Sequence, residues 1–199
     1  KASATIINAQ GLPVGKAAIV ESKKKGLVVT IVVKGLPRGE KGMHLHTIGQ
    51  CEGPKFTSAG PHWNPHGTQH GRDNPMGAHS GDLPNISIGK KGSGKLKFEI
   101  PDMRLHNLID DDGAAIVIHA QSDDNRTDPS GNSGDRIACG VFVEKRNRCK
   151  GARMKKPSSP RQPEARSSDE QRIAKLLARA GVASRREVDA NLDYVAVWN

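Results

Sequence analysis

The first 144 residues alternate short apolar segments with polar, glycine-rich ones. The apolar segments are rich in β-branched residues, and several alternate apolar with polar positions: ATIINA, AAIVE, LVVTIVV, KLKFEI, AAIVIHAQ and RIACGVFVEK. Clusters of Gly, Pro and Lys, such as GLPRGEKG and GKKGSGK, separate them. Strands at this spacing, without helical periodicity between them, are typical of an all-β sandwich or barrel. We expect about eight strands in such a fold.

Two long segments interrupt this alternation. Residues 47–85 are rich in Gly, Pro, Asn and His, and residues 121–135 form the polar stretch QSDDNRTDPSGNSGD. Loops of this length without regular structure are usually either functional or disordered. No apolar run approaches the ~20 residues that a membrane-spanning helix needs, so we expect no membrane span.

The composition changes after Glu144. The segment that follows is basic and rich in Pro and Ser, without a hydrophobic period, which is typical of a linker. Further on, RIAKLLARAGVASRREV places apolar residues at helical spacing, with Gly181 ending one helix and Ser184 capping the next. We therefore predict a domain over residues 1–145, a basic disordered linker over 146–171 and a short α-helical segment over 172–199.

The positive charge follows the same division. The formal net charge is +10. Residues 1–144 carry 17 lysines and arginines against 15 acidic residues, whereas residues 145–199 carry 14 against 6. The basic character therefore belongs mostly to the C-terminal part, where it would favour a polyanion such as RNA or keep a disordered segment solvated.

Histidines form the most unusual pattern. In the strand-like segment MHLHT, His44 and His46 are two residues apart, so both side chains face one side of a strand and can bind one ion. Taken alone, this pair fits a chance alternation or a cupin-like site equally well. The long loop and a later strand add further candidates: His62, His66, His70, His79, Asp82 and His119. Imidazoles with one carboxylate suit zinc and copper better than calcium or magnesium.

Several segments together resemble the Cu/Zn superoxide dismutase family in its bacterial exported form. They are HLH, TSAGPHWNP, QHG, HSGDLPN, VIHAQSDD and GNSGDRIACGV, and the match runs from about residue 3 to residue 144. The resemblance implies one copper per chain, with four ligands: His44, His46, His62 and His119. It also implies one zinc per chain, with the ligands His62, His70, His79 and Asp82. His62 would bridge the two metals through both ring nitrogens, whereas His66 lies where the family has no ligand.

The resemblance also assigns roles to residues around the metals. Asp123 matches the carboxylate that hydrogen-bonds a ligand of each metal. Arg136 matches the arginine beside the copper channel, where a fixed positive charge attracts and orients a small anion. Cys51 and Cys139 match the disulfide that ties the metal loop to the last strand of the barrel. Cys149 has no counterpart in the family, and we expect it to be a free thiol.

The C-terminal segment RIAKLLARAGVASRREV resembles the start of the small RNA-binding domain that heads many bacterial ribosomal pseudouridine synthases. This resemblance implies a phosphate-binding face formed by Arg172, Lys175, Arg179, Ser184, Arg185 and Arg186. However, the continuation DANLDYVAVWN departs from that family. We therefore favour an amphipathic helical hairpin without an RNA-binding function.

The predicted architecture is an all-β Greek-key barrel or sandwich of about eight strands with long metal-binding loops, a basic linker and a short α-helical tail. The predicted function is the dismutation of superoxide at a histidine-bridged copper–zinc site, as part of antioxidant defence. Two alternatives stay open: a non-catalytic copper-binding or buffering module of the same fold, and an RNA-binding fusion protein acting through its tail.

The expected compartment is the periplasm or the exterior of a bacterial cell. The chain begins at Lys1 rather than Met, which suggests either a mature form whose export signal has been removed or a fragment. Dismutases of the bacterial type occur in more than one association state, so a homodimer is one arrangement that the resemblance allows.

Overall fold

The computed structural model describes residues 1–144. The predicted linker over 146–171, the segment over 172–199 with its six RNA-contacting residues, and Cys149 lie outside the described residues. Those assignments stay predictions.

Nine strands run through residues 1–144: β1 (Ala2–Asn8), β2 (Pro13–Ser22), β3 (Gly26–Val33), β4 (Gly39–His46), β5 (Asp82–Ile88), β6 (Gly94–Ile100), β7 (Ala115–His119), β8 (Arg136–Val141) and the two-residue β9 (Val143–Glu144). Only a 3-10 turn, η1 (Thr57–Ala59), and one helical turn, α1 (Leu105–Leu108), interrupt the β structure of this range. The all-β prediction is therefore confirmed.

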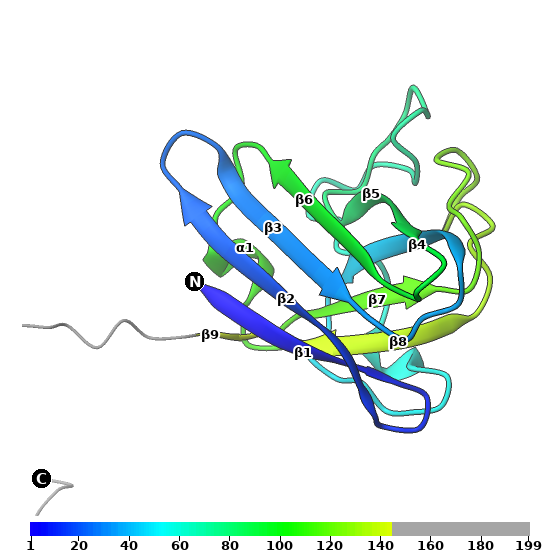
Figure 1. The fold of residues 1–199 in the computed structure, drawn as a ribbon. Helices are drawn as coiled ribbons and strands as arrows, with labels where there is room; N and C mark the ends of the chain where they lie inside the picture. The colour runs from blue at the N-terminus through cyan, green and yellow to red at the C-terminus, as the bar shows by residue number, and fades with distance from the viewer. Residues whose placement is uncertain (145–199) are drawn as a thin grey trace, which may run out of the picture. The chain divides into compact units, whose positions relative to one another are not determined.

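The strands form one antiparallel sheet that nearly closes into a barrel (Figure 1). The hydrogen-bonded order is β5-β4-β7-β8-β1-β2-β3-β6, and β9 pairs with β1. β5 and β6, at the two ends of this order, lie next to each other. Strands that follow each other in sequence are not neighbours at the β3–β4 and β6–β7 connections, which is the Greek-key type of connection that the sequence predicts.

Successive side chains on each strand point alternately into the barrel core and to the outer face of the barrel. On β4, Met43 and Leu45 belong to the large hydrophobic core, so His44 and His46 point away from it. On β7, Ile116 and Ile118 likewise pack in the core. The outer side of β4 and β7 is therefore the place where imidazoles can gather without entering the apolar interior.

Loop residues cover this outer side. Phe56 and Ala59 from the loop after β4 pack with Ala115, Val117 and Cys139 in a second, smaller apolar cluster. The predicted disulfide between Cys51 and Cys139 is present and joins this loop to β8. Because the loops cover it, the outer face of β4 and β7 is buried although it lies outside the barrel core.

Strand β5 is a correction to the sequence interpretation, which placed residues 47–85 in one loop. The strand begins at Asp82, so that loop is shorter than predicted. Its sequence, DLPNISI, contains Asp, Pro and Asn, which are all depleted in strands. Pro84 is tolerated because β5 is the last strand of the hydrogen-bonded order and pairs with β4 alone.

No helix within residues 1–144 has the length and apolar composition that crossing a membrane would require.

Candidate metal centre

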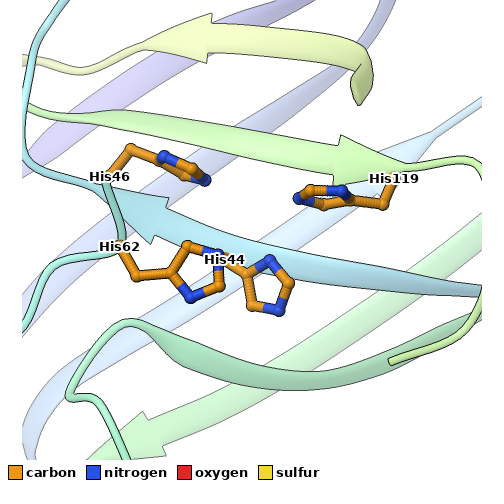
Figure 2. Close-up of side chains that lie close together, drawn as sticks. All are labelled: His44, His46, His62 and His119. Atoms are coloured by element: carbon orange, nitrogen blue, oxygen red, sulfur yellow. The ribbon is translucent and has the colours of Figure 1, made fainter. Parts of the chain in front are cut away.

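Four buried histidines converge on the outer side of β4 and β7 (Figure 2). His44 and His46 come from β4, His119 ends β7, and His62 comes from the loop after β4. One ring nitrogen from each of the four lies within 4.8 Å of the others. A β-bridge between the backbones of His46 and His62 holds the loop beside the strand. The structure thus brings together the whole predicted copper set.

The predicted zinc set forms a second, adjoining group. The Oδ1 atom of Asp82 lies 3.1 Å from His62 Nδ1, 3.1 Å from His70 Nδ1 and 3.3 Å from His79 Nδ1. The Nδ1 atoms of His62 and His79 are 3.3 Å apart. Four tetrahedral ligands at the usual zinc distance of about 2.0–2.1 Å are separated by about 3.3 Å. The spacing of these four atoms therefore fits a single zinc ion, and His62 belongs to both groups.

Backbone carbonyls hold two of the copper-set imidazoles. His46 Nδ1 donates a hydrogen bond to the Gly60 carbonyl at 2.9 Å, and His119 Nδ1 donates to the Gly134 carbonyl at 3.0 Å. A proton on Nδ1 leaves the Nε2 atom of a neutral imidazole as a lone-pair donor. Both rings are thus oriented with Nε2 toward the centre of the group.

Asp123 holds one imidazole from each group. Its Oδ2 atom accepts a hydrogen bond from His44 Nε2 at 2.7 Å, and its Oδ1 atom accepts one from His70 Nε2 at 3.0 Å. The Asp123 side chain is 1% exposed. Asp123 thus lies between one ring of the predicted copper set and one ring of the predicted zinc set.

The opposite nitrogens of these rings are buried without a partner. Within residues 1–144, four buried ring nitrogens have no hydrogen-bond partner: His44 Nδ1, His46 Nε2, His70 Nδ1 and His119 Nε2. A buried polar atom left unpaired is costly, and most such atoms in native proteins have a partner. All four face the two groups just described, so the donor atoms present fit two metal ions.

Burial keeps most of these imidazoles neutral, which is the form that binds metal. It lowers the pKa of His44 to about 3, that of His46 to about 2 and that of His119 to about 4. Burial also lowers the pKa of His62. His70 differs: burial lowers its pKa, but the adjacent carboxylates of Asp123 and Asp82 outweigh burial and raise the pKa to about 9.

Arg136 lies at the edge of the copper set. Its guanidinium donates to the Phe56 carbonyl at 2.8 Å and to the Gly60 carbonyl at 2.9 Å. Within residues 1–144 it forms no ion pair with its neighbour Asp135. Arg136 lines a depression of about 790 Å³ together with His62 and His119. A fixed cation therefore stands where a small anion would approach the imidazoles.

Two further residues at the site were not singled out from the sequence. Asn85 donates to the Asp123 carbonyl and accepts from the Asp123 backbone N–H, both at 2.8 Å. Asp128 accepts a hydrogen bond from the backbone N–H of His70 at 2.6 Å. Asn85 lies in the segment DLPN, and Asp128 is one of several acids in a polar loop, so neither carried a distinguishing signal. His66 is exposed and belongs to neither group.

The comparison with protein families is decisive. The family model described as copper/zinc superoxide dismutase (SODC) matches residues 14–142. The chain belongs to the Cu/Zn superoxide dismutase family. It is therefore a member of an oxidoreductase family whose cofactors are copper and zinc, and the two buried histidine groups are consistent with both metals.

Relatives and solved structures agree with this assignment. Superoxide dismutase (Cu-Zn) 2 of Aquifex aeolicus is 42% identical over 148 residues, which cover 71% of this chain and 86% of the relative. Superoxide dismutase-like protein YojM of Bacillus subtilis is 42% identical over 144 residues, or 69% of this chain and 74% of the relative.

Among solved structures, a SOD-like protein from Bacillus subtilis matches with a TM-score of 0.68 and 41% identity, covering 71% of this chain and 97% of that one. The Cu/Zn superoxide dismutase from Brucella abortus matches with a TM-score of 0.60 and 27% identity, covering 72% of this chain and 100% of that one.

Proposed function

We propose that the chain dismutes superoxide at a copper–zinc pair bridged by His62. Two superoxide anions and two protons yield one oxygen molecule and one hydrogen peroxide. The observation that carries the proposal is the position of His62, which clusters with His44, His46 and His119 and also has its Nδ1 atom 3.1 Å from Asp82 Oδ1. Its Nδ1 atom faces Asp82 and His79, which leaves Nε2 for the copper set.

The proposed metal ligands follow from the two groups. Copper is held by imidazoles: His44, His46, His62 and His119. Zinc is held by three imidazoles and a carboxylate: His62, His70, His79 and Asp82. Support comes from the four buried ring nitrogens without a protein partner and from the 3.1–3.3 Å spacing around Asp82 Oδ1. A closed set of four ligands suits redox-inert zinc, whereas imidazoles suit copper.

The residues of the chain bind, orient and protonate the substrate. When bound, copper supplies the alternation between two oxidation states that lets one superoxide give up an electron and the next accept it. Arg136 attracts superoxide into the depression and orients it beside the imidazoles. When it is not a copper ligand, the Nε2 atom of His62 would hold a proton, which would place a proton donor next to the reduced oxygen species. Asp123 fixes the rings of His44 and His70 and raises their basicity.

The test combines metal content with activity. We expect the purified chain to bind one copper and one zinc, and the loaded protein to accelerate superoxide decay. Copper-loaded protein without activity would favour the alternative, a copper-buffering module of the same fold. A chain that took up neither metal would contradict both. His66→Ala is a matched control, because His66 is an exposed histidine of the same loop outside both groups.

We also propose that the protein works in an oxidising compartment, the periplasm or the cell exterior. The disulfide between Cys51 and Cys139 supports this, because disulfides form and persist in such compartments. Fractionation of expressing cells with compartment markers tests it. Recovery of the enzyme only in the reduced state from the cytoplasm would count against export.

Homodimer formation and RNA binding through the C-terminal part stay predictions, each with its own test. The homodimer is tested by sedimentation equilibrium of the metal-loaded chain. RNA binding through the C-terminal part is tested by gel shift with structured ribosomal RNA, comparing the wild type with an Arg185→Ala, Arg186→Ala variant. Equal weak binding by the two would remove the RNA hypothesis.

A further inference from the structure

We propose that Asp128 is a positioning residue of the zinc site, where its carboxylate holds the backbone of His70 and faces the imidazole of His79. This inference rests on the proposed function for the roles of the two histidines as zinc ligands.

One carboxylate oxygen of Asp128 lies close to both His70 and His79. The backbone N–H of His70 donates to Asp128 Oδ1 at 2.6 Å, and the same oxygen lies 3.9 Å from His79 Nε2. The ring of His70 is already held through Nε2 by Asp123. Among residues 1–144, Asp128 is the one carboxylate within 4.0 Å of His79 Nε2. Asp128 is thus placed to act as the outer partner of the zinc histidine that Asp123 does not reach.

The two contacts differ in strength. A hydrogen bond from an N–H to an ionised carboxylate is short and about twice as strong as a neutral one. The Asp128 side chain is 56% exposed, so solvent screens its charge at 3.9 Å from His79. We therefore assign the larger part of the effect to the bond with the His70 backbone. The smaller part is a bias toward a proton on His79 Nε2, which leaves Nδ1 as the metal ligand.

Backbone contacts fix the position of Asp128 despite its exposure. The Asp73 N–H donates to the Asn125 carbonyl at 3.0 Å. The Asn74 side chain donates to the Arg126 carbonyl at 3.4 Å. A Cβ atom at Gly71 would lie 2.2 Å from the Asn125 carbonyl oxygen, so the two loop segments touch through their backbones. The loop that carries Asp128 is therefore docked on the loop that carries His70.

The outer partners of metal-bound histidines have a measurable effect on metal affinity. Substitution of such a partner typically costs 10–100-fold in affinity. We expect Asp128→Ala to weaken zinc binding by about ten-fold, the lower end of this range, because its main bond is to the His70 backbone and not to a ligand ring. Competition with a chromogenic chelator measures this. Asp128→Asn should weaken zinc binding less, because its amide oxygen still accepts the bond from the His70 N–H. Asp73→Asn is the matched control, since the exposed Asp73 side chain makes no hydrogen bond or ion pair within residues 1–144.

Cobalt(II) in the zinc site gives a second readout. Its visible absorption depends on ligand geometry, so we expect Asp128→Ala to shift the spectrum while Asp73→Asn leaves it unchanged. Wild-type zinc affinity and an unshifted cobalt spectrum in Asp128→Ala would overturn the proposal, even if its metal-free form unfolded more easily. Equal weakening by Asp73→Asn would also overturn it. If Asp128→Asn bound zinc as weakly as Asp128→Ala, the bond to the His70 backbone would not account for the larger part of the effect.

A failure of the proposed function gives a different result in this experiment from a failure of the Asp128 inference. In that case the wild type itself binds no zinc, and no variant can be ranked against it.

Discussion

Imidazoles at this site differ in what their outer nitrogen contacts. Backbone carbonyls hold His46 and His119, whereas the carboxylate of Asp123 holds His44 and His70. A carbonyl orients a ring, and a carboxylate also adds negative charge behind it. Because Asp123 contacts a ring from each group, a change in its position is transmitted to both proposed metal sites.

Asn85 helps to fix the backbone of Asp123 at the site. Its side chain forms two hydrogen bonds of 2.8 Å with the backbone of Asp123. We expect Asn85→Ala to lower the free energy of unfolding by about 1–3 kcal/mol, because a donor and an acceptor near the site lose their partners. Urea unfolding measures this. It should also weaken binding of both metals, measured by chelator competition.

Asn107→Ala is the control for this prediction. Asn107 is exposed, and its side chain makes no hydrogen bond within residues 1–144. If Asn107→Ala cost as much metal affinity as Asn85→Ala, the effect would not come from Asp123.

Asp110 places a negative charge in the same depression as Arg136. A like charge repels superoxide: two unit charges about 10 Å apart in water interact by about 0.4 kcal/mol, or about two-fold in rate. We expect Asp110→Asn to raise kcat/KM about two-fold at low ionic strength, and the gain to disappear as salt screens the charge. Asparagine keeps the oxygen that accepts the Asp112 N–H.

Asp111→Asn removes the same charge from a neighbouring exposed position that does not line the depression. It should change kcat/KM less than Asp110→Asn. Equal gains, or a gain that persists at high salt, would argue against local repulsion at the mouth of the site.

At the scale of secondary structure, the alternation along β4 gives the site its location. Met43 and Leu45 face the core, so His44 and His46, which alternate with them, face the outer side of the barrel. A two-residue period in the sequence predicts this geometry without knowledge of the fold. β5 was not predicted, because its sequence carries no such local pattern. Its strand character depends on pairing with β4, while Pro84 and Asn85 have turn preferences of their own.

The contacts between loops could not be predicted from the sequence. The ligand sets and Asp123 could be named from the resemblance to a family, because motif spacing identifies them. The reciprocal bonds of Asn85 and the contact of Asp128 with His70 join residues 38 and 58 positions apart. Such contacts depend on how two loops dock, and no local pattern of polarity encodes that.

The disulfide anchors the loop that supplies the carbonyls of Phe56 and Gly60 to the site. Cys51 and Cys139 are 88 residues apart in sequence. Closing a loop of this size should stabilise the fold by about 4–5 kcal/mol in the chain-entropy model. We expect Cys51→Ser to lower the free energy of unfolding of the metal-free protein by about that amount, measured by urea denaturation without reductant.

Cys149→Ser is the matched substitution, because this cysteine takes no part in the disulfide. It should leave the unfolding curve unchanged. A large loss in Cys149→Ser, or none in Cys51→Ser, would show that the bond between Cys51 and Cys139 does not govern stability.

At the scale of the whole barrel domain, the buried imidazoles of the site lower the stability of the metal-free protein. A cluster of imidazoles is buried on the outer wall, where burial opposes protonation. The unfolded chain takes up those protons freely once the pH falls below about 6.5. Metal binding and folding are therefore linked to the same ring nitrogens, and acid acts against both.

The stability of the metal-free protein should fall on the acid side of pH 6.5. The pKa values of His44, His46 and His119 are depressed to about 3, 2 and 4, so their contribution is present above about pH 6.5 and is lost as the pH falls. The loss is up to about 1.4 kcal/mol per pH unit for each histidine. The pKa of His70 is raised to about 9, so its contribution is full below pH 6.5 and is lost as the pH rises through 9.

Urea unfolding of the metal-free protein between pH 4 and pH 9 tests this balance. Four imidazoles with a lowered pKa, His62 included, outweigh the one with a raised pKa, so we expect a maximum near pH 6.5, a steep fall toward pH 4 and a shallower fall toward pH 9. Protein loaded with copper and zinc should resist acid to a lower pH, because bound metal keeps the ring nitrogens deprotonated. An unfolding free energy that rose between pH 6.5 and pH 5 would show that these rings are not buried in the metal-free state. The convergence of imidazoles would then be a consequence of metal binding and not a property of the fold.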